Sequence, residues 1–379
     1  MIALCPSRLL TPDGFQTDRC LVIGDGRIVD LLPIEYCPAG AARESLEGDL
    51  VPGFIDLQVN GGGGVLFNDD PTVEGIEAIG RAHRAFGTTG FLPTLISDDL
   101  ETVDRAMRAV EAAIARRVPG VLGIHIEGPF INREKRGIHD ECKIRQLDEP
   151  AIRLLTSLSS GVTLVTLAPE LAPDGTIEAL VAAGVVVAAG HTAASYEQAR
   201  EGLERGVTGF THLFNAMTQL SGRSPGAVGA ALESRDAWCG IIADGFHIHP
   251  ASLRVALAAK GTDTLVLVTD AMPTVGSDRT GFTLGGRPIR LEDGRLTDDG
   301  GTLAGSNLDM ATAVRNAVDL LGVDLATSIR MASVNPARAL GIGGTTGALR
   351  PGLNADLVLL DRDRRVARTW ISGAAAPAR

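Results

Sequence analysis

The chain has 379 residues, of which 45% are hydrophobic and 21% are charged, a composition that is typical of a soluble globular protein and excludes wholesale disorder. Its formal net charge of −11 argues against a nucleic-acid or anionic-membrane surface, although a small basic pocket can still bind an anionic metabolite. The length allows two or three domains of about 150 residues, or one (β/α)₈ barrel of about 250 residues with an addition.

The N-terminal part has two apolar segments on either side of Asp25-Gly26, a dipeptide that is typical of hairpins because glycine accepts a positive φ. The C-terminal part also has two apolar segments, which follow a Pro-Gly turn. We expect residues 1–50 and 346–379 to form one small β-sandwich domain built from both chain termini.

The middle of the chain, residues 51–345, alternates between strand-like and helix-like segments. Eight apolar candidates separated by amphipathic segments favour a closed parallel barrel over an open sheet, and no G-x-G-x-x-G motif follows an early strand. We therefore predict an α/β fold, a (β/α)₈ TIM-like barrel, with a hairpin inserted at residues 281–301. The predicted strands are residues 53–59, 90–95, 121–126, 163–167, 184–189, 208–212, 238–243 and 264–269.

The five cysteines are far apart in the sequence and odd in number, which suits neither a disulfide framework nor a zinc knuckle. Residues 1–17 lack the features of a signal peptide, and the longest apolar run, residues 179–190, is too short to cross a bilayer. We therefore expect a cytoplasmic protein.

Polar side chains follow several of the predicted strands, at the carboxyl ends where barrel enzymes carry their reactive groups. Glu127, His191 and His212 offer one carboxylate and two imidazoles, which leaves a position open for water, as expected of a catalytic divalent metal site. Asp270 ends a later strand and is suited to accept a proton from the activated water. Each residue alone has a structural alternative, such as a hydrogen-bonded core histidine, but the four strand-end positions together favour a metal site.

The other histidines have different interpretations. His247 and His249 have the spacing of a shared strand face, but they lie at a strand-to-helix turn, so we assign only His247 to the substrate. We expect His249 at the surface, His125 as a hydrogen-bonded core residue inside its strand, and His83 as a solvated residue of a helix.

The motifs and their order resemble those of the N-acetylglucosamine-6-phosphate deacetylase family, within the amidohydrolase superfamily. The resemblance covers nearly the whole chain. It rests, in order, on PGFID at residues 52–56, HIEGPF at 125–130, GHT at 190–192, THLFNAM at 211–217, ADGFH at 243–247, VTDAM at 268–272 and GTLAGS at 301–306.

This resemblance implies removal of acetate from the 2-acetamido group of a sugar 6-phosphate, and a homodimer in which the phosphate site is completed across the interface. It implies a metal held by Glu127, His191 and His212, with Asp270 as the catalytic acid/base. We expect one divalent metal ion per subunit, Zn²⁺, with Fe²⁺, Co²⁺ and Mn²⁺ as alternatives that suit similar ligands. The residues that the resemblance assigns to the substrate are His139, which can polarise the amide carbonyl, and Asn215, Ala216, Arg223 and His247.

Two departures from other amidohydrolases favour one metal over a pair. Gln58 and Asn60 stand where many members carry His-x-His, and neither is a good ligand for zinc or iron. No lysine ends a predicted strand, so a bridging carboxylated lysine is not expected. Three alternatives stay open. The first is the same reaction on the galactosamine epimer, since the two sugars differ in one hydroxyl group and no motif here distinguishes it. The other two are a non-catalytic sugar-phosphate-binding protein and a metal-independent sugar-phosphate isomerase.

Overall fold

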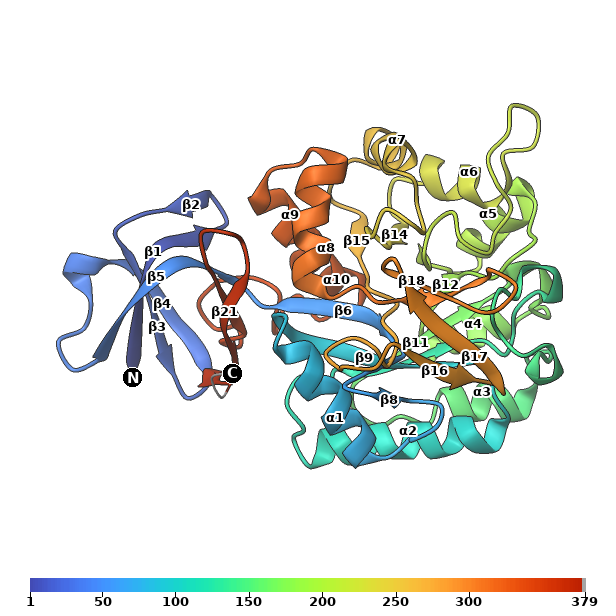
Figure 1. Cartoon of the computed structure of the whole chain (residues 1–379), viewed down its shortest axis with the longest axis horizontal. Coiled ribbons are helices and arrows are strands. Elements are labelled where there is room, and N and C mark those ends of the chain that lie inside the picture. The colour runs from blue at the N-terminus through green and yellow to red at the C-terminus, as the bar shows by residue number, and fades with distance from the viewer. Residues whose placement is uncertain (377–379) are drawn as a thin grey trace.

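The computed structural model describes residues 1–376. Figure 1 shows a helix-covered barrel with a smaller β-sheet domain beside it, and both marked chain ends lie in that smaller domain. The prediction of a (β/α)₈ barrel with an added β domain is confirmed. No helix in residues 1–376 has both the length and the apolar character needed to span a bilayer.

Eight parallel strands form the barrel, and neighbours along the chain pair with each other in order. A single bridge between Val59 and Ala271 brings the first strand next to the segment after the last one, so the barrel is nearly closed. All eight predicted strand regions are confirmed, with ends that differ by a few residues. The strands are β6 (Phe54–Val59), β9 (Thr88–Ile96), β10 (Gly123–Glu127), β11 (Val162–Leu167), β12 (Val186–Ala189), β13 (Gly209–Phe210), β14 (Trp238–Ile241) and β15 (Leu265–Leu267).

Several of the helices begin where the sequence supplies a capping side chain. Thr72 accepts a hydrogen bond from the Gly75 backbone N–H at the start of α1, and Ser195 with Gln198 forms a reciprocal capping box at the start of α5. The helices are α1 (Val73–Arg84), α2 (Leu100–Ala115), α3 (Glu149–Leu155), α4 (Thr176–Ala182), α5 (Tyr196–Glu204), α6 (Gly226–Glu233), α7 (Pro250–Lys260), α8 (Met310–Asn316), α9 (Leu325–Ala332) and α10 (Val334–Ala339).

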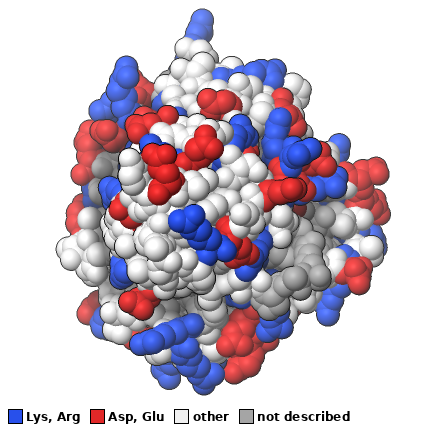
Figure 2. All heavy atoms as spheres, turned by 90° about the vertical axis from the view of Figure 1, so that its left-hand side faces the viewer, with Lys and Arg blue, Asp and Glu red and all other residues white. Residues whose placement is uncertain are grey.

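The smaller domain is one eight-stranded sheet to which both ends of the chain contribute. Its two faces are both covered, because Leu21 and Ile23 belong to one buried apolar cluster while Cys20 and Val22, which alternate with them, belong to another. The domain boundaries at residues 50 and 346 stay a prediction. The strands are β1 (Ile2–Thr11), β2 (Gly14–Gln16), β3 (Arg19–Gly24), β4 (Arg27–Pro33), β5 (Ala42–Pro52), β20 (Leu357–Leu360), β21 (Val366–Ile371) and β22 (Ala374–Ala375). On the face that Figure 2 shows, basic and acidic side chains are intermixed.

The insertion predicted as a hairpin at residues 281–301 is larger than predicted. It is a four-stranded antiparallel sheet whose last strand returns to the barrel, where Ser306 forms a bridge with Ala271. Its strands are β16 (Gly281–Leu284), β17 (Arg287–Glu292), β18 (Arg295–Thr297) and β19 (Leu303–Ser306), and a separate short hairpin follows β6 as β7 (Gly61–Gly62) and β8 (Val65–Leu66).

The prediction that His83 is solvated is wrong, because this residue is fully buried and its Nε2 lies 2.8 Å from the Gly61 carbonyl oxygen. A Cβ on Gly62 would lie 2.8 Å from the His83 ring, so the glycine run is what lets α1 approach this closely.

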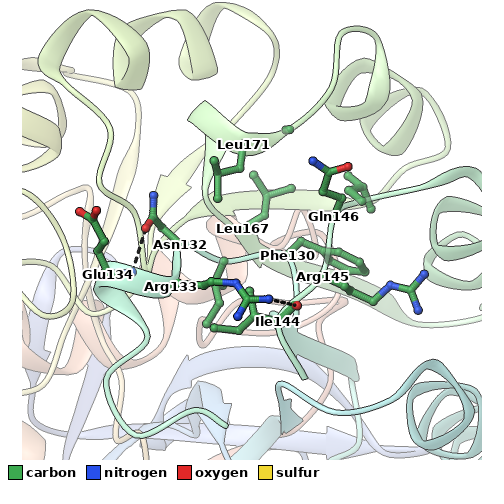
Figure 3. Close-up of a pocket in the computed structure, with 12 residues that line it drawn as sticks. Phe130, Asn132, Arg133, Glu134, Ile144, Arg145, Gln146, Leu167 and Leu171 are labelled. Carbon is green, nitrogen blue, oxygen red and sulfur yellow. Dashed lines mark hydrogen bonds between the residues drawn. The ribbon is translucent and has the colours of Figure 1, made fainter. Parts of the chain in front are cut away.

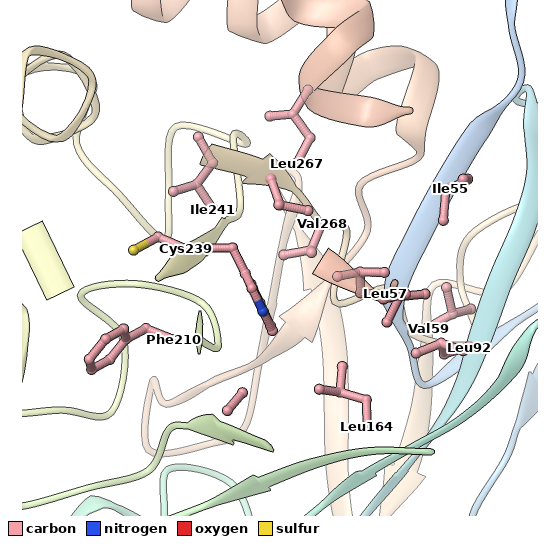
Figure 4. Close-up of a cluster of buried hydrophobic side chains, with 14 of the residues drawn as sticks. Ile55, Leu57, Val59, Leu92, Leu164, Phe210, Cys239, Ile241, Leu267 and Val268 are labelled. Atoms are coloured by element: carbon pink, nitrogen blue, oxygen red, sulfur yellow. The ribbon is translucent and has the colours of Figure 1, made fainter. Parts of the chain in front are cut away.

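The interior of the barrel is filled by side chains and is not a pore. Leu57, Leu164 and Trp238 are among the residues that line a void of about 10 Å³ there. Figure 4 shows the buried cluster, in which Ile55, Leu57, Val59, Leu92, Leu164, Phe210, Cys239, Ile241, Leu267 and Val268 are labelled.

The indole of Trp238 occupies the space that a side chain on Gly209 would need, since a Cβ there would lie 2.0 Å from an indole carbon. We expect Gly209→Ala to lower the free energy of unfolding by about 1–3 kcal/mol because it overpacks the barrel. Urea unfolding measures this. The control Gly343→Ala adds a methyl group in open space and should change the value by less than about 0.5 kcal/mol; equal effects of the two substitutions would contradict the packing argument.

Candidate active site

Three predicted side chains converge at the carboxyl ends of the barrel strands. Glu127 is the last residue of β10, while His191 and His212 follow β12 and β13 by two residues. Glu127 Oε1 lies 3.2 Å from His191 Nε2 and 2.9 Å from His212 Nε2, and the two Nε2 atoms are 3.0 Å apart. All three side chains are buried.

This donor set fits a divalent metal ion. His191 Nδ1 lies 2.8 Å from the Lys135 carbonyl oxygen, and since a carbonyl only accepts, the ring donates from Nδ1 and keeps the Nε2 lone pair free. Ligand atoms around a tetrahedral zinc ion, at about 2.0–2.1 Å from it, are about 3.3 Å from each other. The three distances between the facing atoms of Glu127, His191 and His212 are close to that separation.

His139 lies beside these residues but is oriented differently. A ring nitrogen of His139 that could bind a metal lies within 4.8 Å of the candidate ligand atoms of Glu127 and His191. Its Nδ1 accepts a hydrogen bond from the Ser97 backbone N–H at 3.3 Å and lies 2.7 Å from Ser97 Oγ. Burial and the neighbouring His191 hold the pKa of His139 well below its usual value. The ring is therefore neutral with its proton on Nε2, which makes it a hydrogen-bond donor.

Asp270 follows β15, and two amide side chains on β6 and just after it hold its carboxylate. Gln58 Nε2 donates to Asp270 Oδ1 at 3.0 Å, and Asn60 Nδ2 donates to the same oxygen at 2.6 Å. The Gln58 amide also reaches both oxygens of Glu127, at 3.0 and 3.1 Å. The sequence indicated only that Gln58 and Asn60 are poor ligands; their role as donors to two carboxylates was not predicted.

The carboxylates of the site have different proton affinities. Burial raises the pKa of Glu127, but the adjacent imidazoles of His191 and His212 outweigh it, so this pKa lies well below its usual value. Burial and the charge of Glu127 raise the pKa of Asp270 to about 7. Burial likewise raises the pKa of Asp56, which accepts hydrogen bonds from Thr269, to about 7. Because its pKa is near 7, Asp270 can both accept and release a proton at neutral pH.

The backbone at the site is strained. His191, His212 and Asp270 all have positive φ values, of 48°, 33° and 53°. Such conformations are uncommon outside glycine and are concentrated at functional sites. Each of the three residues lies two or three positions after the end of a barrel strand, so the left-handed turn redirects its side chain there.

The residues assigned to the substrate differ in the contacts that they make. Asn215 Nδ2 donates to the His212 carbonyl at 3.2 Å, and the Ala216 carbonyl accepts from the Thr192 backbone N–H. Arg223 lies on an exposed turn, and within residues 1–376 it makes no hydrogen bond or ion pair with the other candidates.

His247 Nδ1 lies 2.6 Å from Asp244 Oδ2, so that carboxylate holds the ring and leaves Nε2 free. The structural interpretations of two further histidines are confirmed. His125 is buried between Thr94 and Thr166, and exposed His249 caps α7.

Comparison with known proteins assigns the chain to a family. The amidohydrolase family matches residues 50–376. The chain belongs to the amidohydrolase family. It is a hydrolase, and the resemblance noted in the sequence is confirmed.

Curated relatives of this amidohydrolase are similar over most of their length. It is 43% identical to an N-acetylgalactosamine-6-phosphate deacetylase of Shewanella sp., covering 97% of this chain and 94% of that one. It is 36% identical to an N-acetylglucosamine-6-phosphate deacetylase of Haemophilus influenzae, covering 93% of each. A solved N-acetylglucosamine-6-phosphate deacetylase from Pasteurella multocida superimposes with a TM-score of 0.96 at 34% identity over the whole of both chains.

The hydrogen bonds that the Gln58 amide of this amidohydrolase donates to Glu127 and Asp270 can be tested directly. We expect Gln58→Leu to lower the free energy of unfolding of the metal-free protein by about 1–3 kcal/mol, because Glu127 and Asp270 lose a buried donor. Chemical unfolding of the metal-stripped protein measures this, with Gln146→Leu on the surface as the control. An unchanged free energy of unfolding in Gln58→Leu would show that these hydrogen bonds do not stabilise the protein.

Proposed function

We propose that this amidohydrolase hydrolyses the 2-acetamido group of N-acetyl-D-glucosamine 6-phosphate to D-glucosamine 6-phosphate and acetate. The convergence of Glu127, His191 and His212 beside Asp270 carries the proposal, since it supplies a metal site and a proton acceptor in one buried place. The names of the relatives, which are deacetylases of N-acetylhexosamine 6-phosphates, support this choice of substrate.

Glu127, His191 and His212 are the proposed ligands of one divalent ion, Zn²⁺, with Fe²⁺, Co²⁺ and Mn²⁺ as alternatives. When bound, such an ion supplies an activated water and polarises the acetamide carbonyl. The pairwise distances of 2.9–3.2 Å favour this set over one that includes His139, whose Nδ1 already accepts a hydrogen bond from Ser97.

Asp270 is the proposed general base and then the general acid. It takes a proton from the water that attacks the carbonyl carbon and returns it to the amine nitrogen as the C–N bond breaks. Both amide donors, Gln58 and Asn60, bind the same oxygen, Oδ1, which leaves Oδ2 to exchange the proton. His139 donates from Nε2 to the carbonyl oxygen while negative charge develops there.

The sugar phosphate is proposed to contact Asn215, the Ala216 backbone, Arg223 and His247. Arginine and backbone N–H groups suit a phosphate dianion. The exposed position of Arg223 agrees with a phosphate site that a second subunit completes, so we propose a homodimer. Light scattering after size-exclusion chromatography measures the assembly.

The galactosamine epimer is the second candidate substrate. The observation that favours it is the 43% identity to a deacetylase of N-acetylgalactosamine 6-phosphate. The two substrates differ in the orientation of one hydroxyl group, so the ratio of their kcat/KM values measures the preference.

Removal and replacement of the metal tests the proposal. We expect metal-stripped protein to release no acetate and each suitable divalent ion to restore turnover, because the water is otherwise not activated. Both epimers and unphosphorylated N-acetylglucosamine are assayed in parallel. Turnover that survives exhaustive chelation would contradict a metal-dependent reaction, and equal turnover without the phosphate would contradict the substrate class.

The role of Asp270 makes a separate prediction. We expect Asp270→Asn to lower kcat by about 10²–10⁴-fold with its zinc content unchanged, because the amide cannot carry the proton. Asp104→Asn, which removes only a surface ion pair with Arg108, is the matched control. Unchanged product formation in Asp270→Asn would exclude it as the acid/base.

A further inference from the structure

Glu170 connects two loops of the site through a single carboxylate. It lies in the short helix η4 (Pro169–Leu171), directly after strand β11. Thr192 Oγ1 donates to its Oε2 at 2.5 Å, and the Ala193 backbone N–H donates to its Oε1 at 2.8 Å. Asn132 Nδ2 donates to Oε1 at 2.9 Å. The turn after β12 and the loop after β10 are thereby joined to the end of β11.

These two loops also bind each other directly at His191. The Asn132 backbone N–H donates to the His191 carbonyl at 2.9 Å, and His191 Nδ1 donates to the Lys135 carbonyl at 2.8 Å. Lys135 ends the helix η2 (Arg133–Lys135), which the Asn132 side chain caps with its Oδ1. The Asn132 amide therefore both holds the segment that orients His191 and donates to Glu170.

The start of this loop is anchored, since Phe130 and Ile131 are buried and the Ala168 backbone N–H donates to the Phe130 carbonyl at 3.0 Å, but its next part borders a cavity. A cavity of about 470 Å³ lies between the loop and the end of β11. Figure 3 shows Leu167 and Leu171 on one side of it and the loop residues Arg133 and Ile144 on the other. Because side chains do not fill this space, the hydrogen bonds to Glu170 add to the Ala168–Phe130 backbone contact in holding the loop at the end of β11.

We propose that Glu170 is a positioning residue for the metal centre. It holds the turn after His191 against the Asn132 loop, so that the histidine presents Nε2 toward Glu127 before any ion binds. Groups that orient a ligating histidine from outside typically change metal affinity by about 10–100-fold. The inference rests on the proposed metal ligands.

The test compares Glu170→Ala and Glu170→Gln with Glu178→Gln, a control carboxylate on α4 whose side-chain partner is Arg205. Zinc dissociation constants are measured by competition with a chromophoric chelator, together with the visible spectrum of the Co²⁺-loaded protein and the melting temperature. We expect Glu170→Ala to weaken zinc binding by about tenfold or more and to change the Co²⁺ spectrum. Glu170→Gln keeps one acceptor oxygen and should weaken it less, while Glu178→Gln should not change it.

A lower melting temperature with unchanged zinc affinity and an unchanged Co²⁺ spectrum in Glu170→Ala would overturn the positioning role. If wild type binds no metal, the proposed function fails as well; if wild type binds zinc and Glu170→Ala binds it equally well, only this inference fails.

A second set of variants keeps the test available if Glu170→Ala does not fold. Asn132→Ala and Thr192→Val each remove one donor to the carboxylate. Because both act through Glu170, we expect the double variant to weaken zinc binding by less than the product of the two single effects. Independent effects that multiply would contradict a shared positioning residue.

Discussion

The structure depends on one electrostatic constraint: two imidazole nitrogens and a carboxylate oxygen lie within 3.2 Å of one another, away from solvent. A buried carboxylate without a positive partner is expensive, and two neutral histidines supply one only by taking up protons. A divalent cation bound there would resolve the conflict, since it would be the largest local charge and would accept all three lone pairs. Closing eight parallel strands into a barrel is what brings Glu127, His191 and His212 from distant segments to this one point.

The surrounding groups act by fixing orientations. The Lys135 carbonyl holds Nδ1 of His191, and the Asp244 carboxylate holds Nδ1 of His247. The left-handed conformations of the strand-end residues each cost about 1–3 kcal/mol, which the closely packed barrel core can offset. This arrangement prepares the site before substrate or metal binds, and pre-organised dipoles are the largest contribution in many enzymes.

The sequence predicted those features that depend on local pattern. Apolar runs located the eight strands, and the rule that reactive groups follow barrel strands selected Glu127 and Asp270, which the structure places at the ends of β10 and β15; their roles stay a prediction. The roles of Gln58 and Glu170 were not predicted, because each depends on partners that only the tertiary fold brings near. His83 was predicted wrongly because its burial depends on a glycine run in another segment.

The most direct test of the account is the anomalous diffraction of a crystal of the zinc-loaded protein at the zinc edge. The account predicts one anomalous peak per subunit, about 2.0–2.2 Å from Glu127, His191 and His212, with Gln58 and Asn60 still bound to Asp270. A peak coordinated by His139 in place of His212, or a second peak beside Gln58 and Asn60, would contradict it.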